Sequence, residues 1–155
     1  MASRKQHTKK YIRLSRKIKN HEEVLKMKGY IQHGKITTYD HVNDVAELAY
    51  KLSKKLNLKI DDKVLIEGAL LHDFFGYDWH MDKEKKPLFK MHGFTHAKEA
   101  ARRAKEVFDI DAKTEHVIAS HMWPLTLRCV PKTKEAVLVC VADKIISCKE
   151  TLLKR

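Results

Sequence analysis

An all-α fold is what the sequence predicts, and three observations lead to this prediction. Apolar residues recur at intervals of three and four along most of the chain, which is the spacing that places them on one face of a helix. Sustained alternation of apolar and polar residues, which is typical of a half-buried strand, occurs in no segment. The 155 residues are 43% hydrophobic and contain only 5 glycines and 3 prolines, so we expect one domain with a single core.

The N-terminal segment, residues 1–35, is basic and is expected to be accessory to the main domain. Its thin apolar stripe at helical spacing predicts a first helix, and the stripe consists of Tyr11, Ile12, Leu14 and Ile18. Asn20 followed by Glu23 has the form of a capping box, which predicts a second, short helix that Gly29 interrupts. Residues 33–34 then indicate a loop.

Two helices are expected in the centre of the sequence. Thr38 is the predicted N-cap of the first helix, whose apolar stripe continues for about five turns to Leu56. Asp61 or Asp62 caps the second helix, which ends near residues 72–76. Almost every side of the second helix is apolar, so we expect it to lie in the middle of the fold.

Three further helices are expected in the C-terminal half. Residues 77–94 contain Gly, Pro and four consecutive charges, which indicates a loop. Thr95 opens a helix rich in alanine, and its small side chains permit close packing on a neighbour. A shorter helix over residues 113–122 is stopped by Pro124, because proline lacks the amide hydrogen and disfavours the helical conformation before it. The last helix begins near Thr133.

The charge balance points to anionic partners. Lys and Arg total 32 against 20 Asp and Glu, which gives a formal net charge of +12. The basic N-terminus lacks the apolar stretch of a secretory signal, and no segment approaches the roughly 20 apolar residues that span a bilayer. Three cysteines without a Cys-x-x-Cys pair favour buried free thiols in a reducing compartment. We therefore expect a cytoplasmic protein that has no membrane partner.

Histidines and carboxylates fall at positions where the helical pattern points inward. His41 shares a helix face with Val45, so its ring is expected to face the core. His72 and Asp73 are adjacent at the end of the most hydrophobic helix, and no Lys or Arg lies within seven residues before or nine after Asp73. Asp143 interrupts the apolar run VLVCVADKII. A buried carboxylate costs several kcal/mol unless a cation pairs with it, so both acids require a positive partner.

Two more histidines belong to this pattern. His121 shares a face with Val117 and Ile118, and His92 lies just before a predicted helix. A lone inward histidine is more often a hydrogen-bonded core residue than a ligand, and Asp143 alone is compatible with a helix-end acid. Taken together, several inward histidines and two inward carboxylates without matching basic residues are most simply satisfied by metal ions.

The order of these residues resembles a known signature. His41, then His72-Asp73, then Asp143 is similar to the H…HD…D signature of the HD-domain superfamily of helical, metal-dependent phosphohydrolases. The segments TTYDHVNDVAELAYKL, IEGALLHDF and VLVCVADKI resemble the motif helices of that superfamily. The resemblance extends over about residues 36–150, and the whole chain is most similar to small single-domain bacterial HD proteins.

The resemblance implies a fold and a set of metal ligands. It implies a single-domain helical HD fold with the metal site in the core of the bundle, residues 1–35 being accessory and residues 36–155 forming the HD domain. Family members with two metals insert two histidines before the last aspartate. The implied ligands are His41, His72, Asp73, His92, His121 and Asp143, of which His72 and Asp73 are also the implied catalytic residues.

One ligand position has two candidates. In the segment HGFTHA, His92 takes the family's ligand position, and His96 falls where the family often has glycine. The two are close enough that either can be the ligand, so His92 is ranked first and His96 is kept as a residue that supports the ligands or contacts phosphate. His121, in IASHMWP, resembles the second inserted histidine.

Mixed imidazole and carboxylate ligands suit one or two divalent transition metal ions, iron or manganese first and cobalt or nickel next, better than a structural zinc site. The activity that the resemblance implies is metal-dependent hydrolysis of a phosphate ester or anhydride, with a nucleotide as the expected substrate and a metal-bound water as the attacking group. Further contacts to this small anionic substrate are expected from His33, Lys35, His96, Trp123, Arg128 and Lys144.

Two other functions stay open at this point. Some HD-superfamily members with six such ligands are di-iron oxygenases, and the ligands alone do not exclude this chemistry. A non-catalytic protein that binds nucleotides or nucleic acid would use the +12 charge, although the basic residues are spread along the chain and form no recognisable binding motif. Nucleic acid is therefore not the favoured partner. A homodimer through the N-terminal helix is also open.

Overall fold

The computed structural model of the protein describes residues 4–76 and 92–152, apart from the side chains of residues 33 and 92–94. The described part is all-α, as predicted, except for one short hairpin. Its elements are α1 (Arg4–Lys19), α2 (Glu22–Leu25), the 3₁₀ helix η1 (Lys26–Gly29), β1 (Ile31–His33), β2 (Ile36–Thr37), α3 (Thr38–Lys55), α4 (Asp62–Leu71), α5 (His92–Phe108), α6 (Ala112–Ser120) and α7 (Lys134–Leu152).

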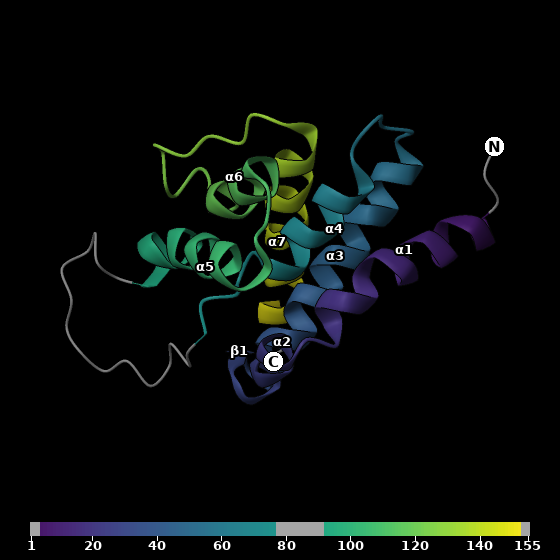
Figure 1. Ribbon diagram of the computed structural model, residues 1–155. Helices are drawn as coiled ribbons and strands as arrows, with labels where there is room; N and C mark the ends of the chain where they lie inside the picture. The colour runs from purple at the N-terminus through teal and green to yellow at the C-terminus, as the bar shows by residue number, and fades with distance from the viewer. Residues whose placement is uncertain (1–3, 77–91, 153–155) are drawn as a thin grey trace.

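Helix α4 lies at the centre of the bundle, as its apolar sequence predicts. It contacts α1, α3, α6 and α7, and α3 in turn packs along α7. Figure 1 shows α1 on one side of these central helices and α5 and α6 on the other. A Cβ on Gly68 of α4 would lie 2.5 Å from a methyl carbon of Val117, so glycine is what permits the close approach of α4 and α6.

Acidic and hydroxyl side chains cap the central helices. Asp61 accepts hydrogen bonds at the start of α4, which decides between the two predicted caps. The N-cap of α3 is Thr37 and not Thr38, because Thr37 has extended backbone and forms a capping box with Asp40. Thr38 is fully buried, and its hydroxyl bonds to Gln32 instead.

The N-terminal segment differs from the prediction in two details. The N-cap of α2 is His21 and not Asn20, because His21 has extended backbone and its Nδ1 accepts from the amide of Glu23. The predicted loop at residues 33–34 covers the last residue of β1 and the start of the turn, residues 34–35, of an antiparallel β1–β2 hairpin, in which Gly34 adopts a positive φ of 60°. Strands this short carry no alternation that a sequence pattern can detect.

Asp62, at the start of α4, forms ion pairs with a lysine of α1 and a lysine of α3. Asp62, whose side chain is almost fully buried, lies 2.7 Å from Nζ of Lys10 on α1 and 2.5 Å from Nζ of Lys54 on α3. Burial raises the pKa of Asp62, but the hydrogen bonds from the two lysines lower it more, so the net shift is downward.

Most of the predicted loop over residues 77–94 lies outside the described residues. Helix α5 begins at His92, three residues before the predicted Thr95. The loop was predicted partly because it contains Gly93. One glycine in a helix costs about 1 kcal/mol, which is small compared with the free energy gained by packing the whole helix. Helix α6 ends at Ser120 with His121 as its C-cap, two residues earlier than predicted, because the chain turns before Pro124.

The prediction of buried thiols holds for one cysteine. Cys140 is buried, Cys129 is half-buried, and Cys148 is exposed. Cys148 lies on the outward face of α7, where the apolar pattern of the sequence wrongly suggested burial. Among the described residues, no helix is long and apolar enough to span a membrane.

Candidate metal centre

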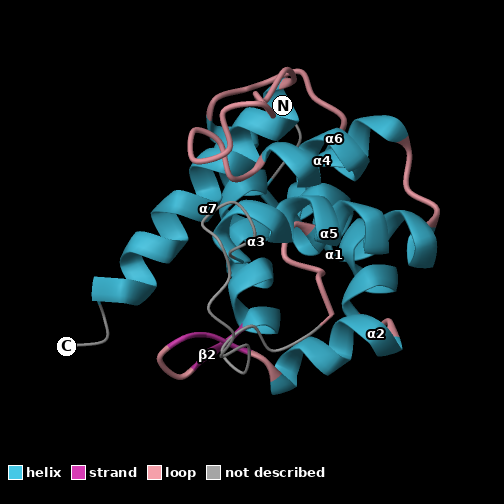
Figure 2. Ribbon diagram, turned by 90° about the vertical axis from the view of Figure 1, so that its left-hand side faces the viewer, coloured by secondary structure: helices cyan, strands magenta, loops and turns pink. Residues whose placement is uncertain are grey.

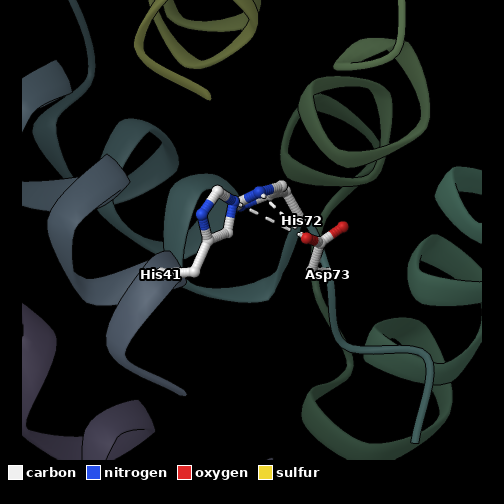
Figure 3. A group of neighbouring side chains, drawn as sticks. All are labelled: His41, His72 and Asp73. Atoms are coloured by element: carbon white, nitrogen blue, oxygen red, sulfur yellow. Dashed lines mark ion pairs between the residues drawn. The ribbon is translucent and has the colours of Figure 1, made fainter. Parts of the chain in front are cut away.

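Five helices bring six ionisable side chains together in the interior of the protein. These residues are His41 on α3, His72 and Asp73 after α4, His96 on α5, His121 after α6 and Asp143 on α7. Each is buried, and His41, His72 and His121 expose at most 1% of their surface. In Figure 3, the rings of His41 and His72 turn toward the Asp73 carboxylate. Helix ends supply three of the six residues, so the cluster lies where α4 and α6 terminate.

Backbone carbonyls fix the tautomer of two of the rings. Nδ1 of His72 lies 2.7 Å from the carbonyl oxygen of Ala69, and Nδ1 of His121 lies 2.7 Å from that of Ile118. Because a carbonyl only accepts, each Nδ1 must carry the proton. Burial also lowers the pKa of His121, which keeps this ring neutral. In the neutral form of each ring, the lone pair therefore lies on Nε2, which is the atom that faces the cluster.

His41 is held between two acids. Its Nδ1 lies 3.0 Å from an oxygen of Glu150, and its Nε2 lies 3.1 Å from Oδ1 of Asp143 and 3.7 Å from Oδ2 of Asp73. The Glu150 carboxylate accepts the Nδ1 proton, so Nε2 is the atom that faces the two aspartates. An imidazole held in this way by a carboxylate presents a more basic nitrogen on its other side.

The centre of the cluster holds acceptors that face one another. Nε2 of His72 lies 3.5 Å from Oδ2 of Asp73 and 3.6 Å from Oδ1 of Asp143, and it makes no hydrogen bond. Oδ1 of Asp73 also makes none, although the Nε2 atoms of His96 and His121 lie 3.3 and 3.5 Å away. Buried acceptors without donors are costly, and a cation among them removes the cost.

Three overlapping groups of donor atoms satisfy the spacing of a metal site. Within each group the ligand atoms lie within 4.8 Å of one another. The groups are His41, His72 and Asp73; His72, His121 and Asp143; and Asp73, His96 and His121. The three cysteines, all of which are described, belong to none of these groups, so the donors are imidazole and carboxylate alone. This donor set fits a divalent transition metal.

Comparison with known proteins agrees with this geometry. The HD-domain family model matches residues 38–147, which is more than two thirds of the chain. The chain belongs to the HD-domain family. No curated protein and no solved structure matches it. HD domains are generally metal-dependent hydrolases that bind divalent metals, and the buried His and Asp cluster is the part of this HD domain that can hold one.

The electrostatics of the HD site favour a cation at its centre. Burial raises the pKa of Asp73, but the neighbouring imidazoles, His72 first, hold it well below its usual range. The pKa of Asp143 is also lowered, because His41 and His72 outweigh the effect of burial. Burial lowers the pKa of His41, yet hydrogen bonds to Asp143 and Glu150 raise it to about 10. Without metal, a proton on His41 therefore supplies part of the positive charge that the two ionised aspartates require.

Two residues around the HD site were missed by the sequence analysis. Glu150 is buried and lies against His41, as described above. Its position seven residues after Asp143 puts both acids on one helix face, which is a signal that the sequence carried. Gln32, from the hairpin, donates to Oδ2 of Asp73 at 2.8 Å and accepts from the hydroxyl of Thr38 at 3.1 Å. No local pattern predicts the Gln32 contact, because it depends on where the hairpin packs.

Of the two candidates for the remaining ligand position, His96 has a described side chain and His92 does not. His96, which was expected to support the ligands or to contact phosphate, lies inside the third donor group, with its Nε2 3.0 Å from that of His121. His92 lies at the first residue of α5, and its side chain is outside the described residues. The structure therefore brings His96 to the HD site.

Four other residues that were expected to contact the substrate are described, namely Lys35, Trp123, Arg128 and Lys144. Lys144 donates to the carbonyl of His121 at 2.9 Å, so it caps the end of α6. Lys35, Trp123 and Arg128 are exposed. The side chain of His33 is outside the described residues.

Proposed function

We propose that this HD protein is a metal-dependent phosphohydrolase that cleaves a phosphate ester or anhydride of a small anionic substrate, with a nucleotide as the first candidate. We propose one or two divalent transition metal ions as its cofactor, iron or manganese first. The observation that carries the proposal is the pair of buried acceptors, Nε2 of His72 and Oδ1 of Asp73, that make no hydrogen bond in the centre of the cluster.

The residues of the three donor groups would hold the metal. His72, Asp73 and His121 each belong to two of these groups, and of the three only the Asp73 carboxylate has two oxygen atoms that could serve as ligands. When bound, the metal supplies Lewis acidity, which makes water a nucleophile at neutral pH and neutralises charge on the phosphoryl oxygens. The protein needs no nucleophile of its own for this chemistry. Its cysteines lie outside the donor groups, and Cys140 is occupied by a contact with the carbonyl of Trp123.

The task of the surrounding residues is to orient the ligands. Glu150 fixes the His41 ring through its Nδ1 proton, and Gln32 fixes one oxygen of Asp73. Carbonyl groups at the ends of α4 and α6 fix His72 and His121. Because these four candidate ligands are each held by a second contact, little reorganisation is needed when an ion or a phosphoryl group arrives.

The surface charge supports an anionic substrate. A net charge of +12 attracts phosphorylated molecules and raises their rate of encounter with the site. We propose Lys35, Arg128 and Trp123 as residues that meet the substrate from outside the donor cluster, together with His33. Nucleic acid stays a less favoured substrate, because the cluster is buried and a small molecule reaches it more readily.

The experiment is phosphate release by protein reconstituted with Mn²⁺, or anaerobically with Fe²⁺, over a panel of nucleotides, dinucleoside polyphosphates and sugar phosphates. Turnover is expected in the wild type and is expected to be lost in Asp73→Asn. Asp109→Asn is the matched control, because this acid is fully exposed and belongs to none of the donor groups, and it should retain full activity. Release that persists in Asp73→Asn would contradict the proposal.

The oxygenase alternative has its own readout. Oxygen consumption by the Fe²⁺ form, without phosphate release from any substrate of the panel, would favour the di-iron chemistry. Phosphate release that proceeds equally with Mn²⁺ under anaerobic conditions would exclude oxygen as a reactant.

A further inference from the structure

Two neutral, half-buried side chains donate hydrogen bonds to the aspartates of the HD site. The amide nitrogen of Gln32, on β1, donates to Oδ2 of Asp73 at 2.8 Å. The hydroxyl of Ser147, one turn after Asp143 on α7, donates to Oδ1 of that aspartate at 3.3 Å. Gln32 and Ser147 are both half-buried, whereas His41 exposes nothing. Each donor therefore touches a candidate ligand on one side and solvent on the other.

The oxygens that Gln32 and Ser147 contact are also the oxygens that face the imidazoles. Oδ2 of Asp73 lies 3.5 Å from Nε2 of His72, and Oδ1 of Asp143 lies 3.6 Å from the same nitrogen. These are atoms that a metal ion among the ligands would use. Because each donor is one hydrogen bond away from such an atom, a substrate oxygen that shares the ion would come within reach of both donors.

The cluster is most exposed beside Ser147. The side chain of Asp143 is 10% exposed, which is the largest value among the six clustered residues, whereas that of Asp73 is 3% exposed. Strand β1 contacts α7, and Figure 2 shows the hairpin below the C-terminal half of that helix. The side of the cluster between β1 and α7 is therefore where a small molecule can approach.

Both donors have capacity for a second acceptor. An amide nitrogen carries two hydrogens, and among the described residues Gln32 uses one of them, on Asp73. Its Oε1 accepts from the hydroxyl of Thr38 at 3.1 Å, which fixes the end of the amide that faces the aspartate. The 3.3 Å contact of Ser147 is long for an O–H···O bond, whose usual length is about 2.8 Å, so this hydroxyl can turn to a stronger acceptor.

We propose that Gln32 and Ser147 contact the substrate directly and donate hydrogen bonds to its phosphoryl oxygens. This inference rests on the proposed phosphohydrolase activity and names two residues that bind its substrate. Within residues 4–76 and 92–152, no Lys or Arg pairs with Asp73 or Asp143. A lysine there would compete with the metal for the carboxylates, whereas an amide and a hydroxyl leave the carboxylate charge to the ion.

The test is the binding of inorganic phosphate to Mn²⁺-loaded protein, measured by calorimetry and by ³¹P relaxation. Bound Mn²⁺ relaxes only phosphate that lies close to the ion, so phosphate held elsewhere on a chain of charge +12 is not counted. Mn²⁺ is kept at saturation for every variant, because loss of the Gln32 donor also weakens the metal site.

Ser147→Ala and Gln32→Met are each expected to weaken phosphate binding about tenfold or more, because each removes a donor to a charged oxygen. Ser147→Thr keeps the hydroxyl and should bind phosphate as the wild type does. The matched controls are Thr151→Ala, which removes an exposed hydroxyl one turn further along α7, and Gln6→Met at an exposed position of α1. Both controls should keep wild-type phosphate affinity, and circular dichroism checks that every variant folds.

The same variants separate this inference from the proposed function. On any substrate that the wild type cleaves, Ser147→Ala and Gln32→Met should raise KM at saturating Mn²⁺. A residue that only orients its aspartate would change Mn²⁺ affinity and leave KM and phosphate affinity of the saturated protein unchanged. That result, with turnover intact, would overturn the inference while the proposed function stands. A Mn²⁺-loaded wild type that neither binds phosphate near the ion nor releases it from any substrate would overturn both.

Discussion

Replacing Glu150 is expected to weaken metal binding without unfolding the protein, because this carboxylate accepts the Nδ1 proton of His41 at 3.0 Å in a buried position. Contacts that orient a metal ligand typically contribute 10- to 100-fold in metal affinity, which is about 1.4 to 2.8 kcal/mol. Glu150→Ala removes both the acceptor and the negative charge, so we expect a loss near the upper end of this range. Glu150→Gln keeps an acceptor oxygen, so its loss should be about tenfold or less.

The assay is calorimetric titration of Mn²⁺ into metal-free protein, with thermal unfolding measured on the same samples. Glu135→Gln is the control, because Glu135 is also a buried acid of α7 but accepts from the amide of Asp61 at 2.8 Å and from Lys113 at 3.1 Å. This variant should lose stability and keep its Mn²⁺ affinity. The reasoning would be refuted if Glu150→Ala bound Mn²⁺ as tightly as the wild type, or if Glu135→Gln lost as much affinity.

Three further predictions follow from other contacts. Gln32→Ala should lower Mn²⁺ affinity about tenfold in the same titration, because Asp73 loses the donor to its Oδ2; unchanged affinity would show that the hairpin does not support the site. Gly68→Ala should destabilise the protein by roughly 1 to 3 kcal/mol in urea unfolding, because its Cβ would lie 2.5 Å from a Val117 methyl carbon; wild-type stability would contradict the close contact of α4 and α6. The lowered pKa of Asp62 contributes stability that is present above its unfolded pKa of about 4 and is lost as pH falls through the lower folded value, so Asp62→Asn should flatten the acid side of the stability curve.

Much of the donor cluster was predictable because helix geometry is local. The burial of His41 follows from its place on an apolar face, and the burial of Asp73 and Asp143 follows from the apolar runs around them. Each of these arguments needs only the residues one or two turns away. The H…HD…D order then supplied the family, which the match to residues 38–147 confirms.

The contacts that the sequence did not predict join distant parts of the chain. Glu150 lies 109 positions from its partner His41, and Gln32 lies 41 positions from Asp73, so only tertiary packing brings them together. The same reason applies to His96, which the sequence ranked below His92 and which α5 places beside His121. Burial of a thiol was also misjudged at Cys148, because an apolar helix face that is left exposed has the same sequence pattern as a buried one.

The central claim is that the six-residue cluster binds a metal, and equilibrium binding of Mn²⁺ to metal-free protein tests it most directly. The account predicts one or two bound ions for each chain, with binding lost in His72→Ala and Asp73→Asn and retained in the exposed control Asp109→Asn. Absence of binding in the wild type, or binding that survives in both His72→Ala and Asp73→Asn, would contradict it.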